Sequence, residues 1–91
     1  MTITVGIVDD GPRIRSCLAF YLQHTAGIEV AFSTDSAPKV LEILGNSPVR
    51  VLLSGIVMPT MDGMELLNRL RQLDTPPRFL GTTSFVSEQS P

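Results

Sequence analysis

Two adjacent aspartates are the first residues of this 91-residue chain whose type and position could support chemistry. Asp9 and Asp10 directly follow the apolar segment from residue 3 to residue 8 and precede Gly11 and Pro12. Acidic residues after a strand often form a solvated turn and a helix cap. Their carboxylate oxygens are also the hard ligands that divalent cations such as Mg²⁺ prefer. Taken alone, the pair leaves both interpretations open.

A second candidate site lies in the stretch VRVLLSGIVMPTMDG, which covers residues 49–63. Its first half is a short apolar run without strict alternation, which is typical of a strand buried on both faces of a parallel sheet. Pro59, Asp62 and Gly63 then have the chemistry of a loop and turn. Ligands of open parallel sheets bind beyond the carboxyl ends of the strands, so residues 54–60 are expected to lie at a site. Gly55 occupies that place and brings no functional side chain.

The rest of the chain supplies the elements that must position these residues. Apolar runs and turn residues predict strands over residues 3–8, 28–32, 49–55 and 78–83. Helical spacing of apolar residues predicts helices over residues 12–24, 36–44 and 63–73. Asp35 or Ser36 is expected to cap the second helix. Asp62, three residues before Glu65, resembles a capping box for the third.

Packing predictions follow from the same helical spacing. Met64, Leu67 and Leu70 are expected to form the apolar stripe of the third helix. Cys17 is expected to be a buried packing residue of the first helix rather than a reactive thiol. His24, near the end of that helix, is interpreted as a residue placed favourably toward the helix dipole rather than as a site residue.

Three strand and helix pairs followed by a strand predict an α/β fold. The expected architecture is a three-layer, doubly wound parallel sheet with helices on both faces. The last predicted strand has no helix after it in this sequence, and an exposed apolar edge strand is prone to pairing with other chains. We therefore expect an incomplete domain, or an edge strand that another chain covers through self-association.

Composition limits the classes of function. Seven basic and nine acidic residues give a formal charge of −2, which argues against this segment itself binding nucleic acid or an anionic membrane. The single cysteine excludes an internal disulfide and a zinc site built from several cysteines. The N-terminal sequence lacks the pattern of a signal peptide or membrane span. A soluble, cytoplasmic protein is expected.

Three motifs in the sequence resemble the receiver domain of two-component response regulators. They are GIVDDGPRIR at residues 6–15, LLSGIVMPTMDGMELL at residues 52–67 and FLGTTSF at residues 79–85. The subgroup they resemble most is the one attached to LuxR or NarL-type helix-turn-helix domains. The resemblance implies a flavodoxin-like receiver fold with strand order 2-1-3-4, and it covers residues 1–91 as one receiver domain that lacks its later elements.

The resemblance also implies a chemistry for the site. In this family an aspartate carboxylate takes a phosphoryl group from a histidine kinase, with Mg²⁺ beside it. By this likeness Asp9, Asp10 and the backbone carbonyl of Val57 are the expected Mg²⁺ ligands, and the hydroxyl of Thr83 is the expected switch and phosphate contact. The phosphoacceptor belongs four residues before Pro59. That position is Gly55, so Mg²⁺ binding should be weakened by the loss of the third carboxylate.

The departure at Gly55 predicts a receiver that is not phosphorylated in the usual way and is not an enzyme. Ser54 is not expected to replace the acceptor, because successive strand residues point to opposite faces. A hydrolase with Asp9 or Asp10 as nucleophile is disfavoured, because phosphatases of that kind separate their two aspartates by one residue. The alternative is a module that binds a small ligand or a protein in a pocket enlarged at Gly55 and acts through dimerisation.

The expected partners follow from the resemblance and from the uncovered strand. They are a histidine kinase, which the glycine makes doubtful, and a second copy in a homodimer or swapped oligomer. DNA would be contacted only through a domain outside this chain, as in a transcriptional regulator.

Overall fold

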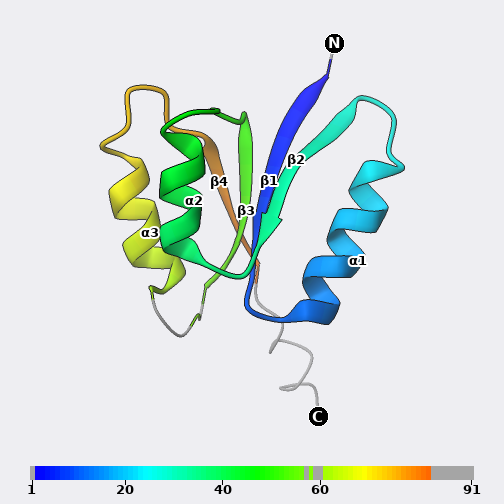
Figure 1. The fold of residues 1–91 in the computed structure, drawn as a ribbon, viewed down its shortest axis with the longest axis horizontal. Coiled ribbons are helices and arrows are strands. Elements are labelled where there is room, and N and C mark those ends of the chain that lie inside the picture. The colour runs from blue at the N-terminus through cyan, green and yellow to red at the C-terminus, as the bar shows by residue number, and fades with distance from the viewer. Residues whose placement is uncertain (1, 57, 59–60, 83–91) are drawn as a thin grey trace.

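The computed structural model describes residues 2–56, 58 and 61–82. Its sheet contains four parallel strands in the order β2-β1-β3-β4 (Figure 1). Their bounds are β1 Ile3–Val8, β2 Ile28–Thr34, β3 Val51–Gly55 and β4 Arg78–Thr82. The predicted strand order is confirmed. Strand β2 extends past its predicted end, because its last residues still pair with Ile7 and Val8 of β1.

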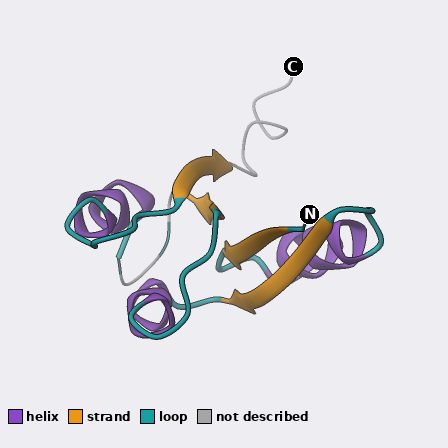
Figure 2. Cartoon of the chain, turned by 90° about the horizontal axis from the view of Figure 1, so that it is seen from above, coloured by secondary structure: helices purple, strands orange, loops and turns teal. Residues whose placement is uncertain are grey.

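Three helices within the described ranges cover the sheet. They are α1 Pro12–Gln23, α2 Ala37–Leu44 and α3 Gly63–Leu70. Helix α1 lies on one face of the sheet, and α2 and α3 lie together on the other (Figures 1 and 2). Each connection from one strand through a helix to the next is parallel, as the alternating pattern of strands and helices predicts. The three-layer architecture is therefore confirmed.

The main hydrophobic core lies between the sheet and the α2 and α3 pair. Leu52 and Leu66 are fully buried at its centre. Gly6 lies on the same face of the sheet, where a Cβ atom would overlap the ring of Phe32. This glycine therefore allows the aromatic ring to pack directly against β1. The buried members of this core are Val8, Ala37, Val40, Leu44, Val49, Leu52, Met58, Leu66 and Leu70.

Helix α1 covers its face of the sheet much less completely. It packs on β1 and β2 and contains no fully buried residue. Phe20 and Tyr21 are 67% and 71% exposed. Cys17 is also exposed, so the prediction that it packs in the core was wrong. The residues of α1 are only partly buried, because the helix packs mainly on β1 and β2, which are two of the four strands.

His24 has a local structural role at the end of α1. Its Nδ1 atom lies 2.8 Å from the carbonyl oxygen of Phe20, and the two rings pack with centroids 4.4 Å apart. The chain then turns at Gly27, whose φ of 85° favours a residue without a Cβ atom. The lone histidine thus helps to end the helix, in agreement with the interpretation that it is not a site residue.

The buried stripe of α3 differs from the prediction. Gly63, Leu66 and Leu70 are buried, whereas Met64 is 56% exposed. The helix also ends at Leu70, so the predicted end at residue 73 was too late. The buried side of a short helix packed against both β3 and α2 is set by those neighbours, which sequence spacing does not identify. None of the helices in the described ranges is long and apolar enough to cross a lipid bilayer.

The caps of the two short helices agree with the predicted signals. The Ser36 side chain accepts a hydrogen bond from the Lys39 amide (3.3 Å), and Asp62 accepts one from the Glu65 amide (2.9 Å). Glu65 itself pairs with Arg69 at 3.3 Å. The first half of the predicted capping box is thus present, and the glutamate side chain forms an i, i+4 ion pair on the helix surface.

Candidate functional site

The carboxyl ends of three strands meet at one edge of the sheet, at the bottom of Figure 1. In the register of the sheet, Val8 lies beside Ser54 and Gly55 lies beside Thr82. The residues that follow these pairs emerge together, so Asp9 reaches both Gly55 and Thr82. Parallel pairing therefore joins residues that are 73 positions apart in the chain.

Asp9 is the central side chain of this edge. It is 6% exposed, and its Oδ1 atom accepts a hydrogen bond from the Gly11 amide at 2.8 Å. Its Oδ2 atom accepts a longer one from the Thr82 hydroxyl at 3.4 Å. Its backbone carbonyl accepts a bond from the Arg15 guanidinium at 2.8 Å. Asp9 is thus held by the following turn, by α1 and by β4.

Asp10 differs from its neighbour because it is exposed. Asp9 therefore agrees with the turn interpretation drawn from the sequence, whereas Asp10 has the exposed carboxylate that a metal site would use. Asp9 orders the turn through the Gly11 amide, as a residue of an Asx-turn does. Asp10 leaves a carboxylate accessible to water at the same edge.

Gly55 lies against the carboxylate of Asp9. A Cβ atom on Gly55 would be 3.0 Å from Oδ2 and 3.3 Å from Cγ of Asp9, and 3.6 Å from Cγ of Met58. Protein atoms therefore fill the space next to this glycine, and Oδ2 of Asp9 would be closer to a Cβ atom there than an ordinary van der Waals contact. This contact does not favour the alternative prediction that the absent side chain leaves an enlarged pocket.

Ser54 faces the other side of the sheet from Gly55. It lies beside Val8 in the register, and Val8 belongs to the core beneath α2 and α3. Ser54 is fully buried, and its hydroxyl donates a 2.9 Å hydrogen bond to the carbonyl of Gly55. Because side chains of a strand alternate between the two faces, as expected, the Ser54 hydroxyl points away from the face on which Gly55 and Asp9 meet.

Thr82 is a site residue that sequence reasoning missed. Its hydroxyl lies 3.4 Å from Oδ2 of Asp9 and 3.3 Å from the carbonyl oxygen of Ser54. Thr83, the residue singled out from the sequence, lies outside the described residues. The signal for Thr82 was strand register, because Thr82 lies beside Gly55 and therefore shares its face.

The loop residues of the second motif divide between described and undescribed positions. Val57 and Pro59 lie outside the described residues. Asp62 caps α3, as noted above, and the Gly63 amide donates a 2.7 Å hydrogen bond to the Ile56 carbonyl. A Cβ atom on Gly63 would lie 2.5 Å from the carbonyl oxygen of Gly55. Glycine at 63 therefore allows the start of α3 to pack against the end of β3.

The described side chains fit a Mg²⁺ site poorly. Within the described residues, no group of three histidine, cysteine or acidic side chains lies close enough to bind one metal ion. Asp9 and Asp10 are the two carboxylates that follow β1, and both oxygens of Asp9 already accept hydrogen bonds. Mg²⁺ sites usually combine carboxylates with several further oxygen ligands. Among the described residues, this end of the sheet thus retains part of a hard-oxygen site without a third carboxylate close enough to share a metal ion.

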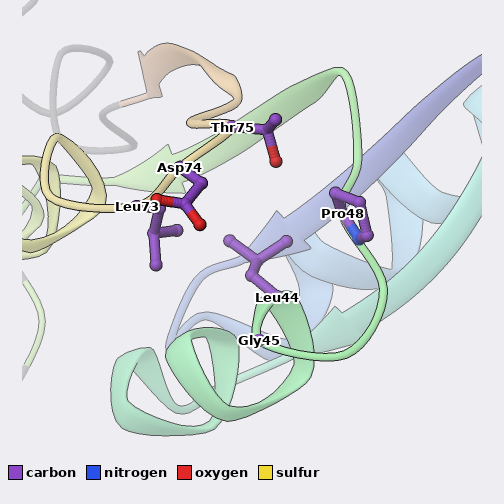
Figure 3. Close-up of a pocket in the computed structure, with 6 residues that line it drawn as sticks. All are labelled: Leu44, Gly45, Pro48, Leu73, Asp74 and Thr75. Carbon is purple, nitrogen blue, oxygen red and sulfur yellow. The ribbon is translucent and has the colours of Figure 1, made fainter.

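A separate hollow of about 290 Å³ lies at the opposite end of the sheet, between the end of α2 and the loop before β4 (Figure 3). Asp74 is the one charged side chain that lines it. Its other lining residues are Leu44, Gly45, Pro48, Leu73 and Thr75. This hollow shares no residue with the edge around Asp9, so it is not part of the candidate site.

The parallel sheet and the acidic residues at its carboxyl end are features that can be compared with known protein families. The family model described as the response regulator receiver domain matches residues 5–90. The chain therefore belongs to the response regulator receiver domain family.

Two similar proteins extend well beyond this chain. The chain is 30% identical over 87 residues to the Fimbriae Z protein of Salmonella typhimurium, covering 96% of this chain and 40% of that protein. It is 34% identical over 73 residues to a protein-glutamate methylesterase/protein-glutamine glutaminase of Paramagnetospirillum magneticum, covering 80% of this chain and 19% of that protein. The chain thus spans less than half the length of each of these two relatives.

A solved structure supports the same assignment. The signal receiver domain of the putative response regulator NarL from Mycobacterium tuberculosis superposes with a TM-score of 0.84 at 25% sequence identity. The match covers 91% of this chain and 67% of that chain. The likeness to receivers of the LuxR and NarL group is therefore confirmed. Receiver domains typically bind Mg²⁺, interact with histidine kinases and form dimers.

Proposed function

We propose that this chain is a receiver domain whose signalling does not depend on phosphorylation. The observation that carries the proposal is the contact between Gly55 and Asp9. Family resemblance assigns the phosphoacceptor to position 55, which carries no nucleophile. The Oδ2 atom of Asp9 would be 3.0 Å from a Cβ atom at that position, so Asp9 also limits what could enter.

The neighbouring nucleophiles do not offer an obvious substitute. Ser54 is fully buried on the opposite face and donates its hydrogen bond to the Gly55 carbonyl. Asp9 is 6% exposed, and both of its carboxylate oxygens accept hydrogen bonds. A nucleophile must be accessible and positioned for attack on the phosphoryl group. Asp10 is exposed, but it lies beyond the strand end and has no described partner that would position it.

The protein context proposed for this receiver is a cytoplasmic transcriptional regulator. The support is its similarity to the Fimbriae Z protein and to the NarL receiver. A protein of the same fold, the two-component response regulator RcsB, has been solved in a complex with DNA. In this proposal a domain outside the chain contacts DNA, a histidine kinase is at most a docking partner, and receiver dimerisation carries the signal.

The experiment that tests the proposal is treatment of the unmodified chain with acetyl phosphate and Mg²⁺, followed by intact-mass spectrometry. We expect no phosphorylated species, while a conventional receiver treated in parallel gains a phosphoryl group. A phosphorylated species of this chain would overturn the proposal. Its stability to mild base would then distinguish a serine ester at Ser54 from an acyl phosphate at Asp9 or Asp10.

A further inference from the structure

A surface hollow of about 550 Å³ lies at the amino ends of β1, β3 and β4, at the end of the sheet opposite to Asp9 (Figure 1). Arg50 and Arg78 are its charged residues, and no acidic residue of the described ranges lines it. Its two arginines give the hollow a formal charge of +2, although the whole chain has a formal charge of −2. An anion attracted to this end of the molecule would therefore respond to local charge and not to net charge.

The backbone of both arginines is held by the neighbouring strands. The Arg50 amide donates to the carbonyl oxygen and to the side-chain oxygen of Thr4, both at 3.1 Å. The Arg50 carbonyl accepts a 2.8 Å hydrogen bond from the Arg78 amide, and Arg78 lies beside Val51 in the register of β3 and β4. The two side chains therefore start from adjacent, fixed positions, which lowers the entropy lost when both bind one ligand.

Neither guanidinium is neutralised by a carboxylate of the described residues. Among those residues the one ion pair joins Arg69 to Glu65 on α3. Asp74, the acidic residue nearest to Arg78 in the sequence, lines the separate hollow of Figure 3. Two like charges in one hollow repel each other, and an anion bound between them offsets that repulsion. The arrangement therefore favours an anionic ligand.

We propose that this hollow binds a small phosphate monoester between Arg50 and Arg78. Each guanidinium presents its N–H donors in a planar fork that matches the oxygens of a phosphate. A phosphate monoester carries about two negative charges at pH 7, which balances the two arginines, whereas a carboxylate carries a single charge. The charge balance therefore favours a phosphate over a carboxylate.

The other walls of the hollow are apolar, which favours an organic ester over inorganic phosphate. Ile3 is 41% exposed, and Val51 and Pro77 are partly buried. Pro76 and Pro77 have φ angles fixed by their rings, so the wall that they form is rigid. Ligand sites typically combine apolar walls with a few charged groups that fix the orientation of the ligand. The organic part of the ester contacts these walls while the phosphate lies between the arginines.

The test is an NMR titration of the 91-residue chain with phenyl phosphate, in EDTA and at constant ionic strength. We expect saturable shifts of the amide signals of Arg50, Val51 and Arg78. Because EDTA removes divalent cations, a phosphate held by a metal ion at the acidic end of the sheet does not contribute. Shifts confined to residues around Asp9, or shifts that do not saturate, would overturn the proposal. The result is independent of whether position 55 can be phosphorylated.

Two variants each remove one charge and keep the backbone hydrogen bonds. Arg50→Gln and Arg78→Gln should each weaken the binding of phenyl phosphate about tenfold, because each loses charge-assisted hydrogen bonds. Arg13→Gln is the matched control, since it changes the net charge equally at an exposed position of α1. Unchanged affinity in the two hollow variants would contradict the proposal. An equal loss in all three variants would show a general charge effect and would contradict it too.

Two further ligands test the chemistry that the hollow recognises. Benzoate has the same ring with a single negative charge, and inorganic phosphate has the phosphate without the ring. Both should bind more weakly than phenyl phosphate. Equal affinity for benzoate would overturn the charge match between ligand and arginines. Equal affinity for inorganic phosphate would show that the hollow takes the free ion, and would overturn the assignment of an ester.

Discussion

The carboxylate of Asp9 lies directly beside Gly55, where a Cβ atom would be 3.0 Å from Oδ2. The same oxygen accepts a hydrogen bond from Thr82, so one carboxylate connects the ends of β1, β3 and β4. A side chain at position 55 would therefore need part of the space that the Asp9 carboxylate occupies. A side chain introduced at 55 must move the carboxylate, and its effect on stability should depend on Asp9.

Replacement of Gly55 by alanine tests this competition. The new Cβ atom would force Asp9 to shift, and overpacking of this kind typically costs about 1–3 kcal/mol. We expect Gly55→Ala to lower the free energy of unfolding in urea, and the penalty to shrink in an Asp9→Ala background. Gly45→Ala is the matched control, because its nearest atom would be 3.4 Å away and its backbone is helical. An equal penalty with and without the Asp9 carboxylate would contradict the account.

The orientation of α3 gives a prediction about packing. Leu66 is fully buried between α3 and the sheet, whereas Met64 on the same helix is 56% exposed. Leu66→Ala should therefore destabilise the chain by about 2–5 kcal/mol, through lost burial and the cavity left behind. Met64→Ala should change stability by less than about 0.5 kcal/mol. Similar losses of stability for the two variants would instead support the buried stripe predicted from the sequence, in which Met64 packs in the core.

The cap of α3 gives a prediction about local structure. Asp62 accepts the Glu65 amide at 2.9 Å, while Ser36 accepts the Lys39 amide of α2 at 3.3 Å. We expect Asp62→Ala to cost about 0.5–2 kcal/mol in thermal or urea unfolding, because the amide loses its acceptor. The longer bond at Ser36 should make Ser36→Ala the smaller change. A larger loss at Ser36 than at Asp62 would be inconsistent with these geometries.

Magnesium should affect this chain much less than it affects a receiver with three acidic ligands. A ligand that binds only the folded state stabilises it more as its affinity rises. Two carboxylates, one of them held by Gly11 and Thr82, provide a weak site. We expect millimolar Mg²⁺ to leave the melting temperature unchanged, with Ca²⁺ and EDTA as controls. A clear stabilisation abolished by Asp10→Asn would show that the site binds metal after all.

Local patterns in the sequence were enough to predict most of the fold. The approximate positions of the strands, the helix start at Pro12 and the caps at Ser36 and Asp62 depend mainly on neighbouring residues, so short-range chemistry determines them. The end of β2 differs from its prediction because it depends on pairing with β1. Strand order followed from the resemblance and agrees with the structure. The local features require no knowledge of which elements meet in space, whereas the strand order does.

The wrong predictions for Cys17 and Met64, and the omission of Thr82, concern properties that depend on distant parts of the chain. Cys17 and Met64 have helical spacing suited to burial, yet no described element packs on them. Thr82 adjoins Asp9 through the pairing of β4 with β3, and a choice between it and Thr83 requires the register. The contact between Asp9 and Gly55 likewise arises only when two strands lie side by side. The spacing of apolar residues indicates the apolar face of one helix or strand. It does not indicate which other element packs on that face.

The most direct test of the central claim restores the missing acceptor. The unmodified chain, Gly55→Asp and the neutral, similarly sized Gly55→Asn would each be treated with acetyl phosphate and Mg²⁺ and weighed by intact-mass spectrometry. We predict that only Gly55→Asp gains a phosphoryl group, because it alone supplies a carboxylate beside Asp9 and Asp10. Phosphorylation of the unmodified chain would contradict the account, and failure of all three would show that Gly55 is not the sole reason for the loss.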